Sequence, residues 1–83
     1  MVRTAFDGRD IIKVLTSYDY RIVGHEGSHV KLRLDRDDLD EPRIVTVPLK
    51  SRDEISANTF RSIAEQCGAD DFHEWCRWID RNR

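Results

Sequence analysis

Apolar residues recur at i, i+3, i+4 and i+7 in three segments of the chain, which is the spacing of an amphipathic helix. Each stripe lies on an otherwise polar segment, so each helix is expected to pack on a core with one face. The predicted helices are Asp7–Tyr18 with Asp7 as its cap, a segment that ends at Gly68 with Ser56 or Asn58 as its cap, and about residues 71–81.

Two segments between the first two helices are rich in β-branched side chains, which favours strands. The earlier one, Tyr20–Val23, is expected to close at Gly24 before a turn over His25–Gly27. The later one, Arg43–Val47, is expected to end at Pro48 because proline cannot continue a strand ladder.

Between these two lies a strand over Ser28–Leu34, which alternates strictly between apolar and polar side chains. Its polar side chains cannot be buried without a large cost, so we expect that face to stay open to solvent. The apolar face consists of Val30, Leu32 and Leu34, and the polar face consists of His29, Lys31 and Arg33.

The order of these elements predicts an α+β fold. One helix, three strands and two further helices give a three-stranded antiparallel meander with the helices on one face of the sheet. With 83 residues the chain is expected to form a single domain over residues 1–83, since a chain of this size buries only roughly 60% of its unfolded surface. Any site must therefore lie on the open sheet face, at a helix end or in a loop.

The cysteines and the hydropathy favour a cytoplasmic protein. Cys67 and Cys76 both fall at apolar positions of predicted helices, which indicates buried thiols in a reducing compartment rather than a disulfide. No segment is apolar over the roughly 20 residues that a membrane span needs, so no membrane partner is expected.

The formal net charge of −2 argues against a uniformly basic surface for nucleic acid, because affinity for phosphates comes from clustered Lys and Arg. The charges are unevenly distributed, however. Five acidic residues crowd into Asp35–Glu41, whereas Lys31, Arg33, Lys50 and Arg52 stand on neighbouring segments. A surface with one locally basic area is therefore compatible with the composition.

Short motifs occur in a fixed order along the chain. They are Gly27-Ser28-His29, then Val47-Pro48, then Thr59-Phe60-Arg61-Ser62-Ile63 running into Gln66-Cys67-Gly68. In this order and spacing the sequence resembles the HicA (YcfA-like) toxins of bacterial and archaeal toxin–antitoxin pairs over about residues 8–68. In that family the G-S-H segment opens the second strand and the V-P pair ends the third.

The resemblance implies a fold like the double-stranded-RNA-binding domain, to which the helix at about residues 71–81 is added. It also implies a toxin that cleaves mRNA without a metal ion or other cofactor, that a cognate HicB antitoxin neutralises, and that does not bind DNA on its own. On this resemblance His29 is the catalytic residue, acting as a general acid or base. The candidate RNA-binding residues are Ser28, Lys31, Arg33 and Lys50.

Three positions leave alternatives open. Lys50 stands where many relatives have a second histidine, and a lysine binds phosphate but is a poor proton shuttle near pH 7. His25 is either the missing second proton-transfer group or a solvated turn residue. Ser28 either bonds to phosphate or satisfies the end of a strand.

The residue pattern by itself also fits simpler interpretations. The polar strand face can be an ordinary solvated surface, and the chain can be a non-catalytic RNA-binding or protein-interaction module of the same fold. His73 and Cys76 have helical i, i+3 spacing but supply only two of the four ligands of a structural zinc site, so no metal site is expected. Trp75 is expected in the core, and Trp78 either packs on a helix or contributes to an interface.

Overall fold

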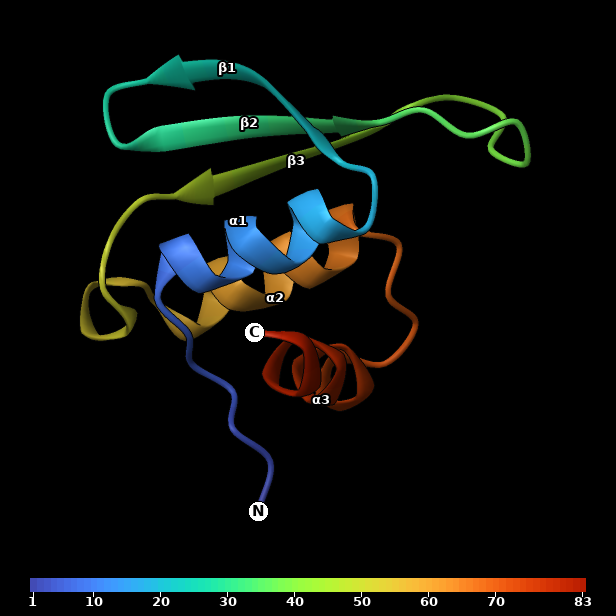
Figure 1. Ribbon diagram of the computed structural model, residues 1–83. Helices are drawn as coiled ribbons and strands as arrows, with labels where there is room; N and C mark the ends of the chain where they lie inside the picture. Colours follow the sequence, from blue (N-terminus) through green and yellow to red (C-terminus); the bar gives the residue numbers. More distant parts are fainter.

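The computed structural model describes residues 1–83 and has the predicted order of elements (Figure 1). A helix, three antiparallel strands, a second helix and a C-terminal helix confirm the α+β fold class. No helix is long and apolar enough to cross a membrane. The elements are α1 (Gly8–Ser17), β1 (Arg21–Glu26), β2 (His29–Leu34), β3 (Arg43–Pro48), the 3-10 helix η1 (Arg52–Glu54), α2 (Ala57–Gln66) and α3 (Phe72–Asn82).

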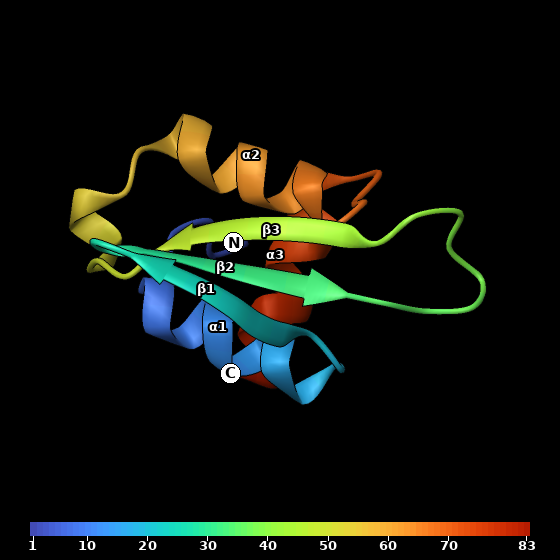
Figure 2. The same cartoon turned by 90° about the horizontal axis from the view of Figure 1, so that it is seen from above.

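The elements are arranged in layers. The sheet has the strand order β1-β2-β3, and α1 and α2 lie against one of its faces (Figure 1). The C-terminal helix α3 packs on α1 and α2 on the side away from the sheet. Seen from above, the opposite face of the sheet carries no helix (Figure 2). The polar face of β2 is therefore uncovered, as the alternation predicts.

One core of 18 buried hydrophobic residues joins the sheet to the helices. The apolar face of β2 is buried against α1 and α2, and Trp75 lies in the core as expected. Cys67 and Cys76 are free thiols within the same core, which confirms their predicted burial.

The first hairpin differs from its prediction. β1 does not close at Gly24 but continues to Glu26, and the turn contains only Gly27 and Ser28. Gly27 has φ +60°, which the first central residue of a tight two-residue hairpin turn needs. An irregularity in the β1–β2 register just before Gly24 lets the strand continue past that residue. The predicted turn over residues 25–27 was therefore wrong.

The start of α1 also differs from its prediction. Asp7 occupies the cap position, but its side chain does not cap the helix. Its Oδ1 instead accepts a hydrogen bond from the backbone N–H of Arg52 at 2.8 Å and faces the Arg52 guanidinium at 3.3 Å. Next to it, Gly8 N–H donates to the carbonyl of Lys50 at 2.9 Å. A Cβ on Gly8 would lie 1.9 Å from the carbonyl oxygen of Pro48, so α1 begins directly on the segment that follows β3.

The other helix ends agree with the sequence. Ser56, and not Asn58, caps α2 through a hydrogen bond that its side chain accepts at 3.1 Å. Gly68 follows α2 with φ +80°, as a helix stop requires. Asp71 caps α3 by accepting the N–H of Glu74 at 3.1 Å.

Candidate functional site

The open sheet face gives His29 two defined neighbours. His29 is the first residue of β2, and its cross-strand partners are Glu26 of β1 and Pro48 of β3. Residues directly opposite in an antiparallel pair point to the same face, with Cβ atoms about 4.5–5.5 Å apart. A carboxylate therefore lies beside the imidazole, on the same uncovered face of the sheet.

His29 also lines two surface hollows. The first, of about 390 Å³, lies on the open sheet face, and its wall includes His25, Glu26 and Lys31. The second, of about 480 Å³, is a groove between the outer edge of β3 and α2, and its wall includes Lys50. The imidazole therefore stands where the two hollows meet, with one lysine in each. We call the first the face hollow and the second the helix groove.

α2 lines the helix groove mostly with polar, uncharged side chains. Gln66 Oε1 accepts a hydrogen bond from the backbone N–H of Thr46 at 2.8 Å, which holds α2 beside β3 (Figure 2). Residues at the start of α2 line the same groove, and helix N-termini favour anions, although the N–H of Thr59 is already bonded to the Ser56 side chain. The polar residues that α2 and its cap contribute are Ser56, Asn58, Thr59, Ser62 and Gln66.

One carboxylate in the helix groove is already bound. Glu54 Oε1 accepts hydrogen bonds from the side chain of Ser51 at 2.9 Å and from its backbone N–H at 3.3 Å. These bonds from Ser51 lower the pKa of Glu54. Because Glu54 is committed to its capping box, Lys50 is the cation of this groove that has no ion pair.

Arg33 shares the open face with His29 but lies near the opposite end of β2. Its Nε donates to both carboxylate oxygens of Asp35 at 3.1 Å, and Arg21 donates to the same carboxylate at 3.0 Å. Hydrogen bonds from Arg21 first, and then from Arg33, hold the pKa of Asp35 below its usual range. The structure therefore brings Lys31 and Lys50 to His29, whereas Arg33 pairs with the acidic loop.

Ser28 lies in the turn before His29. Its carbonyl accepts a hydrogen bond from the backbone N–H of Leu49, which ties the hairpin turn to the segment after β3. Its side chain lines neither the face hollow nor the helix groove. The contact made by Ser28 is thus a backbone contact that supports the position of His29.

Metal ligands are not clustered in this chain. No three His, Cys, Asp or Glu side chains lie together in an arrangement that could hold a metal ion. His73 and Cys76 have helical spacing but differ in burial, because Cys76 is in the core and His73 is exposed.

Two parts of the site were missed from the sequence. Glu26 was assigned to a turn, although a two-residue turn at Gly27 would have placed it opposite His29. The polar row of α2 was also missed, and its signal was the spacing of Thr59, Ser62 and Gln66 at i, i+3 and i+7. Glu26 adds a group that can accept a proton, and the polar row of α2 adds groups that can bond to phosphate oxygens. Both features lie next to the imidazole.

Comparison with known proteins gives one match. The family model described as the HicA toxin of bacterial toxin–antitoxin matches residues 8–69. This segment contains the whole sheet and every residue that lines the face hollow or the helix groove, whereas α3 lies outside it. Searches of the curated proteins and of the solved structures found no match.

Proposed function

The chain belongs to the HicA toxin family, and on that premise we propose that it cleaves mRNA with His29 as a general acid/base. Membership makes it the toxin of a toxin–antitoxin system, with a cognate antitoxin of the HicB type as its proposed partner. The observation that carries the proposal is the position of His29 between the face hollow and the helix groove, with Glu26 opposite it. We assign this activity to the cytoplasm, where mRNA is available.

The proposed reaction uses the 2′-hydroxyl of the RNA itself. Glu26 accepts the 2′-hydroxyl proton as the oxygen attacks the adjacent phosphorus, so a P–O2′ bond forms. The P–O5′ bond breaks, and protonated His29 donates its proton to the departing oxygen. The products are a 2′,3′-cyclic phosphate and a 5′-hydroxyl. Glu26 thereby fills the role that relatives with a second histidine give to that residue.

Phosphate binding is assigned to the two hollows. Lys50 and the N–H groups at the start of α2 offer positive charge to a phosphate in the helix groove. Lys31 offers an ammonium to the neighbouring phosphate on the sheet face. Arg33 contributes in a weaker way because Asp35 shares its charge. Ser28 contributes indirectly, because the hydrogen bond that its carbonyl accepts from Leu49 N–H supports the position of His29. We propose that a single RNA strand crosses the sheet at His29.

A purified-protein assay tests this function. His29→Ala should abolish cleavage of labelled RNA while its circular dichroism spectrum is unchanged, and a chelator should not affect the unmodified protein. His73→Ala is the matched control, because His73 is exposed on α3 outside both hollows and its replacement should leave the rate unchanged.

The same assay separates the second candidate function, a non-catalytic RNA-binding or protein-interaction module. The net charge of −2 and Lys50 at the position of a second histidine favour that candidate. RNA binding without product, by folded unmodified protein, would establish the module and refute the nuclease. Cleavage that survives in folded His29→Ala protein would refute the assigned role of His29.

A further inference from the structure

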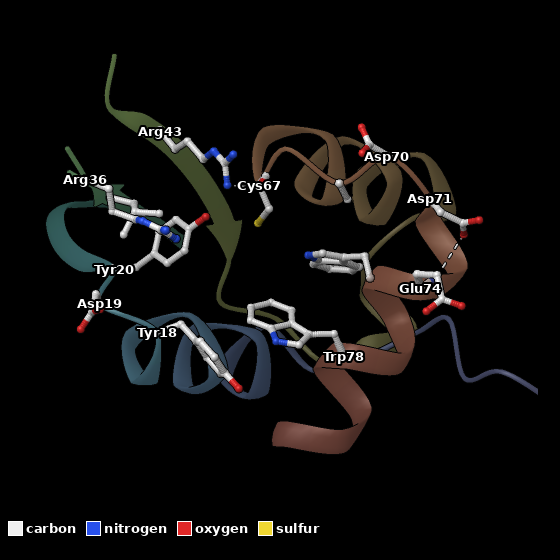
Figure 3. Close-up of a pocket in the computed structure, with 13 residues that line it drawn as sticks. Tyr18, Asp19, Tyr20, Arg36, Arg43, Cys67, Asp70, Asp71, Glu74 and Trp78 are labelled. Atoms are coloured by element: carbon white, nitrogen blue, oxygen red, sulfur yellow. Dashed lines mark hydrogen bonds between the residues drawn. The ribbon is translucent and has the colours of Figure 1, made fainter. Parts of the chain in front are cut away.

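A separate cavity of about 550 Å³ opens at the other end of the sheet (Figure 3). β2 runs from His29 to Leu34, and Leu34 lines this cavity, so the cavity and the proposed nuclease site lie at opposite ends of one strand. The wall combines the residues that follow α1, the end of β2, the start of β3, the segment between α2 and α3, and α3 itself. Four aromatic side chains contribute to it: Tyr18, Tyr20, Trp75 and Trp78.

The inner wall of this cavity has more hydrogen-bond donors than acceptors. Tyr20 is only 7% exposed, and Figure 3 shows its hydroxyl directed toward Arg43 and Cys67 at the inner wall. Burial raises the pKa of Tyr20 to about 12, so the hydroxyl keeps its proton. Arg43 uses one N–H on the carbonyl of Cys67 at 2.9 Å. The indole N–H of Trp75 is the one buried side-chain polar atom without a partner, and an indole N–H can only donate.

Most of the charges that form no ion pair around this cavity are negative, and the exception is the half-buried guanidinium of Arg43. Asp19 and Asp70 stand on opposite sides of it in Figure 3, and neither forms an ion pair. The Arg36 guanidinium, in contrast, makes two hydrogen bonds at 2.9 Å to Asp38 outside the cavity. Arg43 is bound to a carbonyl, as described above. A ligand approaching the mouth therefore meets carboxylates first.

We propose that this cavity binds a short extended segment of a protein partner in which an apolar side chain is flanked by lysine or arginine. The apolar side chain fills the space between the aromatic side chains and is thereby removed from water. Backbone carbonyls of the segment accept hydrogen bonds from Tyr20 and Arg43. The flanking cations face Asp19 and Asp70. A nucleic acid is disfavoured because its phosphates would meet the same carboxylates.

The two tryptophans of the chain provide a direct measurement, because both line this cavity. Titration with the peptide acetyl-Lys-Leu-Lys-amide should change the intrinsic fluorescence saturably. Acetyl-Lys-Gly-Lys-amide lacks the apolar side chain, and acetyl-Glu-Leu-Glu-amide reverses the charge. The Lys-Gly-Lys peptide should bind at least about tenfold more weakly, because it loses the burial of the leucine side chain. The Glu-Leu-Glu peptide should also bind more weakly, because its carboxylates would face Asp19 and Asp70.

Variants of the protein test the two polar contributions separately. Tyr20→Phe keeps the ring and should weaken peptide binding about fivefold, because it removes one hydrogen-bond donor. Asp19→Asn with Asp70→Asn should weaken it as well, and asparagine tolerates the φ of +73° at position 19. The matched control is Asp37→Asn with Asp40→Asn, which changes the net charge equally but lies outside the cavity and should bind normally.

Several results would overturn this proposal, and none depends on RNA cleavage. One is the absence of any saturable change with the Lys-Leu-Lys peptide. Another is equal binding of the Glu-Leu-Glu peptide, which would show that attraction to Arg36 and Arg43 outweighs repulsion by Asp19 and Asp70. A third is equally weakened binding in both double-asparagine variants. Thermal unfolding of each variant checks that it is folded before it is titrated.

Discussion

Glu26 and His29 flank the two-residue turn of the first hairpin and are direct cross-strand partners on the uncovered face of the sheet. The turn fixes this relationship, because a hairpin with a two-residue loop allows one register only. The pair is thus built by the backbone and does not depend on a distant element of the fold.

Glu26→Gln is expected to lower kcat of RNA cleavage by about 10²-fold, the lower end of what a positioned general base supplies. The variant keeps the size of the side chain but replaces one acceptor oxygen with an amide nitrogen that cannot accept a proton, so RNA binding should not be lost. Glu65→Gln, an exposed carboxylate of α2 that lines neither hollow, is the control and should leave kcat unchanged. An unchanged kcat in folded Glu26→Gln protein would remove the general-base role.

Lys50→Ala should reduce the salt dependence of RNA binding more than Arg33→Ala. Removing the charge that neutralises one phosphate lowers the slope of log K against log salt by about 0.7–0.9. Lys50 is free of ion pairs in the helix groove, whereas Arg33 is paired with Asp35. Binding of a short labelled RNA to His29→Ala protein, measured at several salt concentrations, gives both slopes without cleavage. Equal slopes for the two alanine variants would contradict the assignment of Lys50.

Gly8→Ala should destabilise the protein by about 1–3 kcal/mol, the usual cost of overpacking. The added Cβ would lie 1.9 Å from the Pro48 carbonyl oxygen, and backbone on both sides must move to accommodate it. Chemical denaturation measures the effect. Gly24→Ala is the comparison, because its Cβ would lie an ordinary 3.7 Å from the Lys31 side chain. If the Gly8→Ala protein were as stable as the unmodified protein, the close approach of Gly8 to Pro48 would not constrain the fold.

Asp7 should make the folded state sensitive to acid. Hydrogen bonds from the Arg52 side chain, and then from its backbone N–H, lower the pKa of Asp7. Its stabilising contribution is therefore present above the unfolded carboxyl pKa of about 3.9 and is lost as the pH falls through the lower folded value. The free energy of unfolding, measured from about pH 5 down to about pH 2, should fall less steeply in Asp7→Asn than in the unmodified protein. Asp37→Asn, an exposed loop control, should follow the unmodified protein.

The two thiols should be unreactive in the native protein. Burial raises the pKa of both cysteines, that of Cys76 to about 11, so little thiolate is present near pH 8. Ellman's reagent should react more than about tenfold more slowly with native protein than with protein in denaturant, where both thiols react. Rapid reaction of one thiol in native protein would show that its helix opens locally.

The local parts of the fold could be predicted from the sequence, because they depend on neighbours in the chain. The alternation over Val30–Leu34 placed Lys31 correctly on the open face, and Asp71 caps α3 as its position indicates. The end of β1 was harder to predict from the sequence. Gly24 and Gly27 both suit a turn, and only pairing with β2 decides that Gly27 makes it.

The helix groove and the cavity could not be predicted in the same way. The hydrogen bond from Thr46 to Gln66 joins residues 20 apart in sequence, and Tyr18 meets Trp78 with ring centroids 4.9 Å apart. Such contacts depend on how α2 and α3 pack, which hydrophobic periodicity does not specify. Asp7 illustrates the same limit, because a distant arginine takes the carboxylate that local rules assign to a cap.

Gln66 occupies the outer edge of β3 at the point where a further strand would have to form hydrogen bonds. The other edge strand, β1, has no paired strand on its outer side. An added strand would run past Gly24–Glu26 and border the hollow that contains His29. Growth of the sheet along β1 would thus take place beside one of the two hollows that open on His29.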